Sequence, residues 1–251
     1  MKISIIIPTK NEHGNVDRLI KKINEITEKY NLDNELLVID DNSTDGTIED
    51  VEKICRSQKN LHLYQRSQYS HLFPKYPKKW KYLGIGSAHK VGYNLAKGDF
   101  IITIDADLSQ PPEKIMDLIN LLKNGYDIGI GSRYIKGAKS EQRILNHIIS
   151  RVGNIYLSIM FRLRITDFSN GYRIIKKEIW EKIKRYEYTN ANNFLIELLY
   201  YGHVNGAKIG ETPIYFKKRE IGNSKTPFKE EVLKALYLPI KLKRLNQKSR
   251  R

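Results

Sequence analysis

Short apolar runs alternate with helical patterns through the first half of the chain, and this alternation limits the fold more than any other feature. Ile3–Ile7, Glu35–Ile39 and Phe100–Ile104 are brief and rich in branched aliphatic residues, which is typical of buried strands. Val16–Tyr30 has apolar residues at helical spacing. Further strands are expected at Leu61–Gln65 and Asp127–Gly131, and further helices at Thr47–Ser57, Ser87–Ala96 and Pro112–Lys123. Repeated strand–helix units predict an α/β fold with a mainly parallel sheet and helices on both faces.

The pattern changes after Gly137. Gln142–Leu163 and Phe228–Leu245 each combine apolar residues at helical spacing with many Arg or Lys side chains. Such a helix either packs against the protein or lies in a membrane interface with its cations at the headgroups. We favour the interface because the chain has two such segments and no apolar run near the roughly 20 residues that span a bilayer. Without a signal-peptide layout at the N-terminus, a soluble or peripheral protein is expected.

The net charge of +16 indicates an anionic partner. An excess of this size favours nucleic acid, an anionic membrane surface or phosphorylated ligands. The sequence has no motif with the spacing of a zinc finger, an RNA-recognition sheet or a basic zipper, so we expect no nucleic-acid partner. The single cysteine, Cys55, excludes an internal disulfide and a cysteine-based metal site.

Polar residues follow the predicted strands at the points where they end. Asp105-Ala106-Asp107 closes the run Phe100–Ile104. Paired carboxylates suit Mg²⁺ or Mn²⁺, and Mg²⁺ takes few protein carboxylates while substrate phosphates fill its other positions. The other polar strand ends are Pro8–Glu12, Asp40–Thr47 and Gly131–Tyr134. Open α/β sheets bind ligands at this edge, so the four ends together predict a site for a cation and a diphosphate.

These motifs, in this order, resemble those of the GT-A glycosyltransferases of family 2. The resembling motifs are Ile-Pro-Thr-x-Asn-Glu, Asp-Asp-x-Ser-x-Asp-Gly-Thr, Gly-Ser-Ala, Asp-Ala-Asp-Leu and Gly-Ser-Arg-Tyr. Asp167–Arg173, Glu211–Ile214 and the pair Arg219 and Lys225 narrow the resemblance to the polyprenyl-phosphate mannosyltransferases, over residues 3 to about 225. It implies a GT-A, Rossmann-like sheet plus C-terminal amphipathic helices. It also implies a catalytic domain at 1–225, including the amphipathic segment 141–164, and a basic tail at 226–251.

The resemblance also implies roles for individual residues. The nucleotide-sugar site would comprise Pro8, Lys10, Glu12, Ile39, Asp41, Asp105, Ala106, Asp107, Arg133, Arg219 and Lys225. Asp105 and Asp107 would hold Mg²⁺ or Mn²⁺, and Asp107 and Arg133 would take the most direct part in transfer. The acceptor phosphate would meet Arg133, Ser150 and Arg151. Arginine suits phosphate because its guanidinium donates as a bidentate fork.

Some positions depart from the family pattern. Relatives often have Gln near the metal two residues after the second Asp, whereas this chain has Ser109 followed by Gln110. Some relatives have basic residues where this chain has Asn146 and Asn193. The aromatic and Lys-rich segment Arg66–Leu83 is longer than usual, and its two prolines predict a loop. This loop is either a solvated insertion or a lid that touches the membrane.

The implied reaction is an inverting transfer of a hexose, with mannose from GDP-mannose as the expected donor, to dolichyl or polyprenyl phosphate. The chain lacks the Gln-x-x-Arg-Trp motif of relatives that glycosylate hydroxyls. A phosphate monoester needs no general base, because its second pKa is about 6. Glu197 is the nearest candidate base, although a structural role is favoured. The enzyme is expected in the cytoplasm, peripheral on the cytosolic face of a membrane, with a membrane-anchoring partner subunit as a further expectation.

Three alternatives stay open. The same fold could use UDP-glucose, UDP-GlcNAc or another donor, because the motifs do not separate guanine from uracil. A second alternative is a family 2 enzyme directed at hydroxyls, which would depend on Glu197. The third is a non-enzymatic, basic membrane- or nucleic-acid-binding protein on an inactive GT-A scaffold.

Overall fold

The computed structural model describes residues 1–66, 68, 84–186, 188, 193–219, 221 and 228–249, with side chains of the last helix described for 235–245. Most of the loop expected at Arg66–Leu83 lies outside these residues, as does Lys225. No helix within the described ranges combines the length and the apolar character needed to cross a bilayer.

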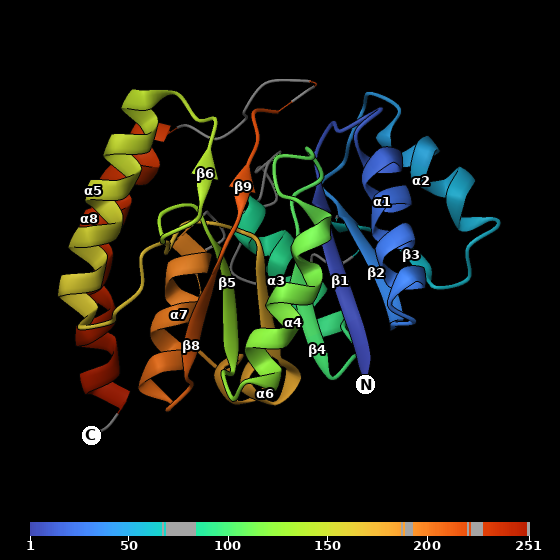
Figure 1. Ribbon diagram of the computed structural model, residues 1–251. Coiled ribbons are helices and arrows are strands. Elements are labelled where there is room, and N and C mark those ends of the chain that lie inside the picture. Colours follow the sequence, from blue (N-terminus) through green and yellow to red (C-terminus); the bar gives the residue numbers. More distant parts are fainter. Residues whose placement is uncertain are drawn as a thin grey trace.

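A seven-stranded sheet forms the centre of the molecule, in the order β3-β2-β1-β4-β7-β5-β8 (Figure 1). Its strands are β1 (Lys2–Thr9), β2 (Asp33–Asp40), β3 (Leu61–Gln65), β4 (Phe100–Thr103), β5 (Ile128–Ser132), β7 (Arg173–Lys176) and β8 (Ile209–Pro213). Neighbouring strands run parallel except at β7, which is antiparallel to both β4 and β5. The predicted α/β fold with a mainly parallel sheet is confirmed.

Helices cover both faces of the sheet because alternate residues of each strand point to opposite sides. On one face, Ile3, Ile5 and Ile7 of β1 pack with α1 (Val16–Lys29), and the same core takes in α2 (Thr47–Cys55) and α4 (Ile115–Lys123). On the other face, Ile6 belongs to a second core. The helices of that core are α3 (Ile85–Leu95), α5 (Ile144–Phe161), α6 (Lys177–Ile183), α7 (Asn193–Val204) and α8 (Phe228–Ser249).

The two basic amphipathic segments form the helices α5 and α8, which lie side by side at one end of the sheet (Figure 1). The Tyr156 hydroxyl on α5 donates a 2.8 Å hydrogen bond to the Leu236 carbonyl on α8. A two-stranded parallel pair, β6 (Lys139–Ser140) and β9 (Tyr215–Phe216), connects the region before α5 to the segment that carries Arg219. The downstream half is therefore folded back onto the strand ends of the first half.

Candidate active site

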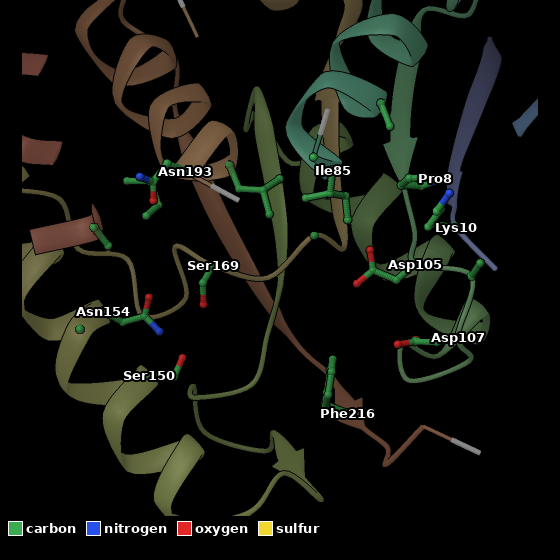
Figure 2. A pocket seen from close by; sticks show the side chains of 18 of the residues that line it. Pro8, Lys10, Ile85, Asp105, Asp107, Ser150, Asn154, Ser169, Asn193 and Phe216 are labelled. Atoms are coloured by element: carbon green, nitrogen blue, oxygen red, sulfur yellow. The ribbon is translucent and has the colours of Figure 1, made fainter. Parts of the chain in front are cut away.

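The ends of β1, β2 and β4 meet at one edge of the sheet. Thr9 pairs with Asp40 across β1 and β2, and Ile6 pairs with Thr103 across β1 and β4. A cavity of about 370 Å³ lies at this edge. The expected site residues that line it are Pro8, Lys10, Glu12, Asp41, Asp105, Ala106, Asp107, Ser150 and Arg219 (Figure 2). The predicted convergence of polar strand ends on one site is therefore observed for these three strands.

Arg219 bridges two carboxylates in this cavity. Its Nη2 lies 2.7 Å from Asp107 Oδ2, and its Nη1 lies 3.2 Å from Glu12 Oε1. Glu12 also accepts a 3.0 Å hydrogen bond from the Asn15 amide, which fixes its side chain. Arg219 comes from the segment after β9, so this contact joins the downstream half of the chain to the ends of β1 and β4.

Asp105 is half-buried at the cavity wall, and the pKa of its carboxyl is raised. Burial and, after it, the negative charge of Asp107 raise its pKa to about 7. The Gln110 amide holds this carboxyl: its Nε2 donates to Asp105 Oδ2 at 2.6 Å, and its Oε1 accepts from the Asp105 backbone N–H at 2.9 Å. Gln110 was assigned no role from the sequence. The one clue to it was that Gln110 directly follows Ser109, which stands where relatives often have a Gln near the metal.

The carboxylates suit a divalent cation. The negative charge of Asp107 helps to raise the pKa of Asp105, so a positive charge placed between the two carboxylates would be favourable. Within the described ranges no group of three or more His, Cys, Asp or Glu side chains is arranged to hold a metal. Asp105 and Asp107 would therefore supply the protein ligands, and phosphate oxygens or water the rest. Ser109 Oγ is buried without a hydrogen-bond partner among the described residues, which leaves it available to such a ligand shell.

Asp41 lies on the side of the cavity where the nucleoside was expected. Its carboxylate is buried and forms an ion pair with Arg66, whose guanidinium also donates to the Gly84 carbonyl at 2.9 Å. Lys10 Nζ donates to the backbone carbonyls of Asp41 and Asn42 at 2.7 and 2.6 Å. Burial raises the pKa of Asp41 above its usual value, despite the opposing charges of Arg66 and Lys10. Ile39, expected in the nucleoside pocket, is fully buried in the core and does not line the cavity.

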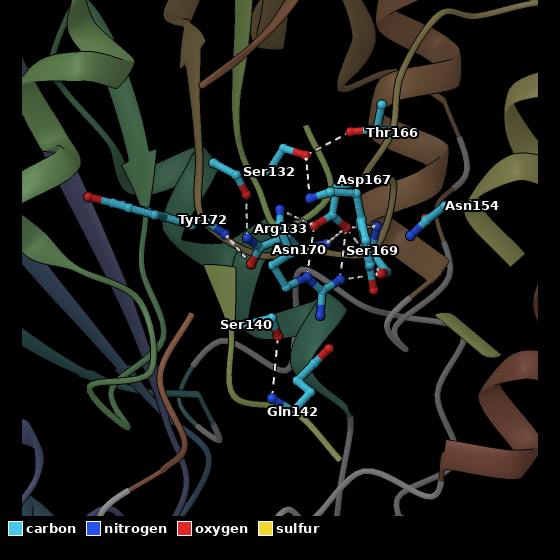
Figure 3. Close-up of polar contacts among 12 residues, drawn as sticks. Ser132, Arg133, Ser140, Gln142, Asn154, Thr166, Asp167, Ser169, Asn170 and Tyr172 are labelled. Carbon is cyan, nitrogen blue, oxygen red and sulfur yellow. Dashed lines mark hydrogen bonds and ion pairs between the residues drawn. The ribbon is translucent and has the colours of Figure 1, made fainter. Parts of the chain in front are cut away.

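Arg133 forms a bidentate ion pair with Asp167 behind the cavity wall (Figure 3). Its Nε and Nη2 each lie 2.8 Å from an Asp167 oxygen, and Nη2 also donates to Ser169 Oγ at 2.8 Å. Although burial alone lowers it, the Asp167 carboxylate raises the pKa of Arg133 above its usual range. Arg133 does not line the cavity, whereas Ser169 does. Ser169 therefore lies between the Arg133 guanidinium and the cavity.

The far wall of the cavity combines uncharged polar groups with apolar ones. Figure 2 shows Ser150, Asn154, Ser169 and Asn193 on the side opposite Lys10, Asp105 and Asp107. Asn154 Oδ1 accepts from the Phe168 N–H at 2.9 Å, while its buried Nδ2 has no hydrogen-bond partner among the described residues. The apolar lining comes from Ile149, Gly153, Tyr156, Leu157, Leu195, Ile196, Ala235 and Leu236.

The expected acceptor residues are separated in the fold. Ser150 lines the cavity, Arg133 lies behind it, and Arg151 is exposed on the outer side of α5. Glu197, the candidate general base, is buried in α7 and is not part of the cavity lining. The described wall therefore offers hydroxyl and amide donors to an acceptor.

Known proteins are similar to this chain, two of them in sequence and a third in fold. Dolichol-phosphate mannosyltransferase of Pyrococcus furiosus is 34% identical over 94% of this chain, which spans 63% of that relative's length. Polyprenol monophosphomannose synthase of Mycolicibacterium smegmatis is 28% identical over 88% of this chain and 79% of its own. Glucosyl-3-phosphoglycerate synthase from Mycobacterium tuberculosis, solved with Mn²⁺, UDP and phosphoglyceric acid, has the same fold, with a TM-score of 0.67, 18% identity and coverage of 95% of this chain and 78% of its own. Residues 4–184 match glycosyl transferase family 2, so the chain belongs to that family.

Proposed function

We propose that this protein transfers mannose from GDP-mannose to dolichyl or another polyprenyl phosphate, with inversion at the anomeric carbon. The observation that carries the proposal is a cavity lined both by the carboxylates at the strand ends and by apolar side chains of α5 and α8. One end suits a cation-bound diphosphate, and the other suits a lipid phosphate. The two mannosyltransferase relatives support the same sugar and the same class of acceptor.

At the donor end, Asp105 and Asp107 would hold Mg²⁺ or Mn²⁺. When bound, the cation neutralises the charge that develops on the departing nucleoside diphosphate. Gln110 keeps the Asp105 carboxyl oriented, and Arg219 supplies a guanidinium that can turn from Asp107 to a phosphate oxygen. Asp41 and Lys10 hold the nucleoside side of the donor, at the ends of β1 and β2.

At the acceptor end, the lipid phosphate would attack the anomeric carbon while the nucleoside diphosphate leaves from the opposite face. This gives a β-linked lipid phosphosugar. The phosphate is already a nucleophile at neutral pH, so the position of Glu197 outside the cavity lining agrees with a reaction that needs no general base. Ser150, Asn154 and Ser169 can donate hydrogen bonds to the attacking phosphate, and Arg133 polarises Ser169 from behind.

The outer side of α5 suits an anionic membrane surface. Its apolar residues form one exposed stripe, with Ile144 80%, Val152 61% and Ile159 70% exposed. On the neighbouring α8, Tyr237 is 75% exposed. Apolar patches of this kind mark interaction surfaces, and the net charge of +16 favours anionic headgroups. We therefore propose peripheral attachment at the cytosolic face, next to the cavity that would receive the lipid phosphate, with a membrane-anchoring subunit as a further candidate partner.

A transfer assay with radiolabelled donor and dolichyl phosphate in vesicles tests the proposal. We expect a lipid-linked product from GDP-mannose, its loss with EDTA, and its recovery with added Mg²⁺ or Mn²⁺. Labelled UDP-glucose and UDP-GlcNAc run in parallel, and transfer from one of these alone would correct the donor while retaining the acceptor. The absence of lipid-linked product from every donor, with nucleotide binding intact, would contradict the proposal.

A further inference from the structure

We propose that Arg66 is a positioning residue for the donor nucleotide, since its buried guanidinium fixes the Asp41 carboxylate with one oxygen left for the ligand. This inference rests on the proposed use of a nucleotide donor. It concerns a residue that does not line the cavity and that no motif of the sequence singled out as functional.

Arg66 joins three separate parts of the fold. Its side chain is 1% exposed and extends from the end of β3. Nη2 pairs with Asp41 Oδ1 at the end of β2, while Nη1 donates to the Gly84 carbonyl at 2.9 Å and to Ser87 Oγ. Gly84 and Ser87 form the start of α3, so one guanidinium links two strand ends to a helix N-terminus.

This geometry pairs only one of the two carboxylate oxygens of Asp41. Oδ1 is taken by Arg66, whereas Oδ2 is buried and has no hydrogen-bond partner among the described residues. A buried carboxylate oxygen without a partner is costly unless a ligand supplies a donor. Asp41 lines the cavity, so a base N–H or a ribose hydroxyl is the donor that this oxygen suits.

The local charges explain why Arg66 is needed. Burial opposes ionisation of Asp41, and the neighbouring Asp40 carboxylate opposes it further. Arg66 and Lys10 are the cations that act against these two effects. The other charged groups lining the cavity are Glu12, Asp105, Asp107 and Arg219. Without Arg66 the Asp41 carboxyl would take up a proton more readily, and a protonated carboxyl accepts hydrogen bonds less well.

The experiment compares nucleotide binding in Arg66→Met, Arg66→Lys and the double variant Arg66→Met/Asp41→Leu, with Arg56→Met as control. Arg56 is an exposed arginine at the end of α2, outside the cavity lining. We expect Arg66→Met to raise the Kd for GDP about tenfold to a hundredfold, as befits the loss of hydrogen bonds to a charged group. Arg66→Lys should recover little, because a single ammonium cannot serve Asp41, Gly84 and Ser87 together.

Three readouts separate positioning of the nucleotide from a contribution to stability alone. The double variant removes both charges, so its melting temperature should return towards that of the wild type while nucleotide binding stays weak. In Arg66→Met, nucleotide affinity should fall more steeply than in the wild type as the pH is lowered through the range in which Asp41 protonates. The value of kcat at saturating donor should change far less than KM.

Folded Arg66→Met protein with wild-type affinity for GDP and UDP would overturn the inference. Recovery of nucleotide binding in the double variant would do the same, because it would assign Arg66 to stability alone. A wild-type protein that binds neither nucleotide would instead refute the proposed function, on which the inference depends.

Discussion

Replacing Arg219 with glutamine should change metal binding and nucleotide binding in opposite directions. In the structure its guanidinium lies 2.7 Å from Asp107 Oδ2 and 3.2 Å from Glu12 Oε1. It therefore occupies, as a positive charge, the neighbourhood in which a divalent cation would sit. A metal ion that binds Asp107 without nucleotide must first displace this contact.

The contact distances set the expected magnitude. A hydrogen bond to a charged partner is worth about 1.5–3 kcal/mol. We take the lower end because the Arg219 side chain is 24% exposed and solvent screens the pair. Loss of a competitor of this strength should lower the Kd for Mn²⁺ about tenfold. The Kd for GDP should change in the opposite direction and rise, because the variant lacks the guanidinium that would bind phosphate.

Calorimetric titration of Mn²⁺, with and without GDP, measures both effects. Lys218→Gln is the matched control, since it removes the same charge from an exposed neighbour that contacts neither Asp107 nor Glu12 in the described structure. Arg219→Lys should behave between the wild type and Arg219→Gln. If Arg219→Gln binds Mn²⁺ no more tightly than the wild type when nucleotide is absent, the idea that Arg219 competes with the cation is refuted.

Three further predictions concern the metal site, the membrane surface and stability. Asp107→Asn should lower transfer about a hundredfold or more while sparing liposome binding; near-normal turnover would remove the metal assignment. Val152→Glu and Ile155→Glu on α5 should each weaken binding to anionic liposomes roughly tenfold or more without weakening GDP binding, and unchanged liposome binding would exclude this face. Asp127 lies 2.7 Å from Lys176, and although burial opposes it, hydrogen bonds from Lys176 and Lys208 lower its pKa. Asp127→Asn should therefore lower the free energy of unfolding by about 1 kcal/mol at neutral pH. That difference should vanish as the pH falls from about 4 through the lowered pKa; a loss that persists in acid would point to another cause.

The local pattern of the chain was sufficient to predict its first half. Branched aliphatic runs and helical spacing placed β1, β2, β3, β4 and β5 and the helices between them close to their observed bounds. The meeting of Lys10, Asp41 and Asp105 at one edge followed from the same pattern, because parallel strands end on the same side. The resemblance to family 2 then brought Arg219 into the site, and it does line the cavity.

The downstream half was harder to predict because its contacts join residues far apart in the chain. The strand β7 is short, lies between β4 and β5, and runs against both, which no periodicity in its own four residues indicates. Arg133, which was expected at a phosphate, pairs with Asp167 and donates a hydrogen bond to Ser169, and of these three only Ser169 lines the cavity. Nothing near Arg133 in the sequence predicts that partner.

Residue type and periodicity were enough to predict the strands and helices of the first half and the strand ends that carry its polar residues. Those properties depend on neighbours within a few positions, where periodicity and residue type act directly. The pairing of cations with carboxylates follows from the three-dimensional packing: Arg66 with Asp41, Arg133 with Asp167, and Arg219 with Asp107 and Glu12. Such pairings depend on distances and burial that arise when separate elements pack, because charges interact through space rather than along the chain.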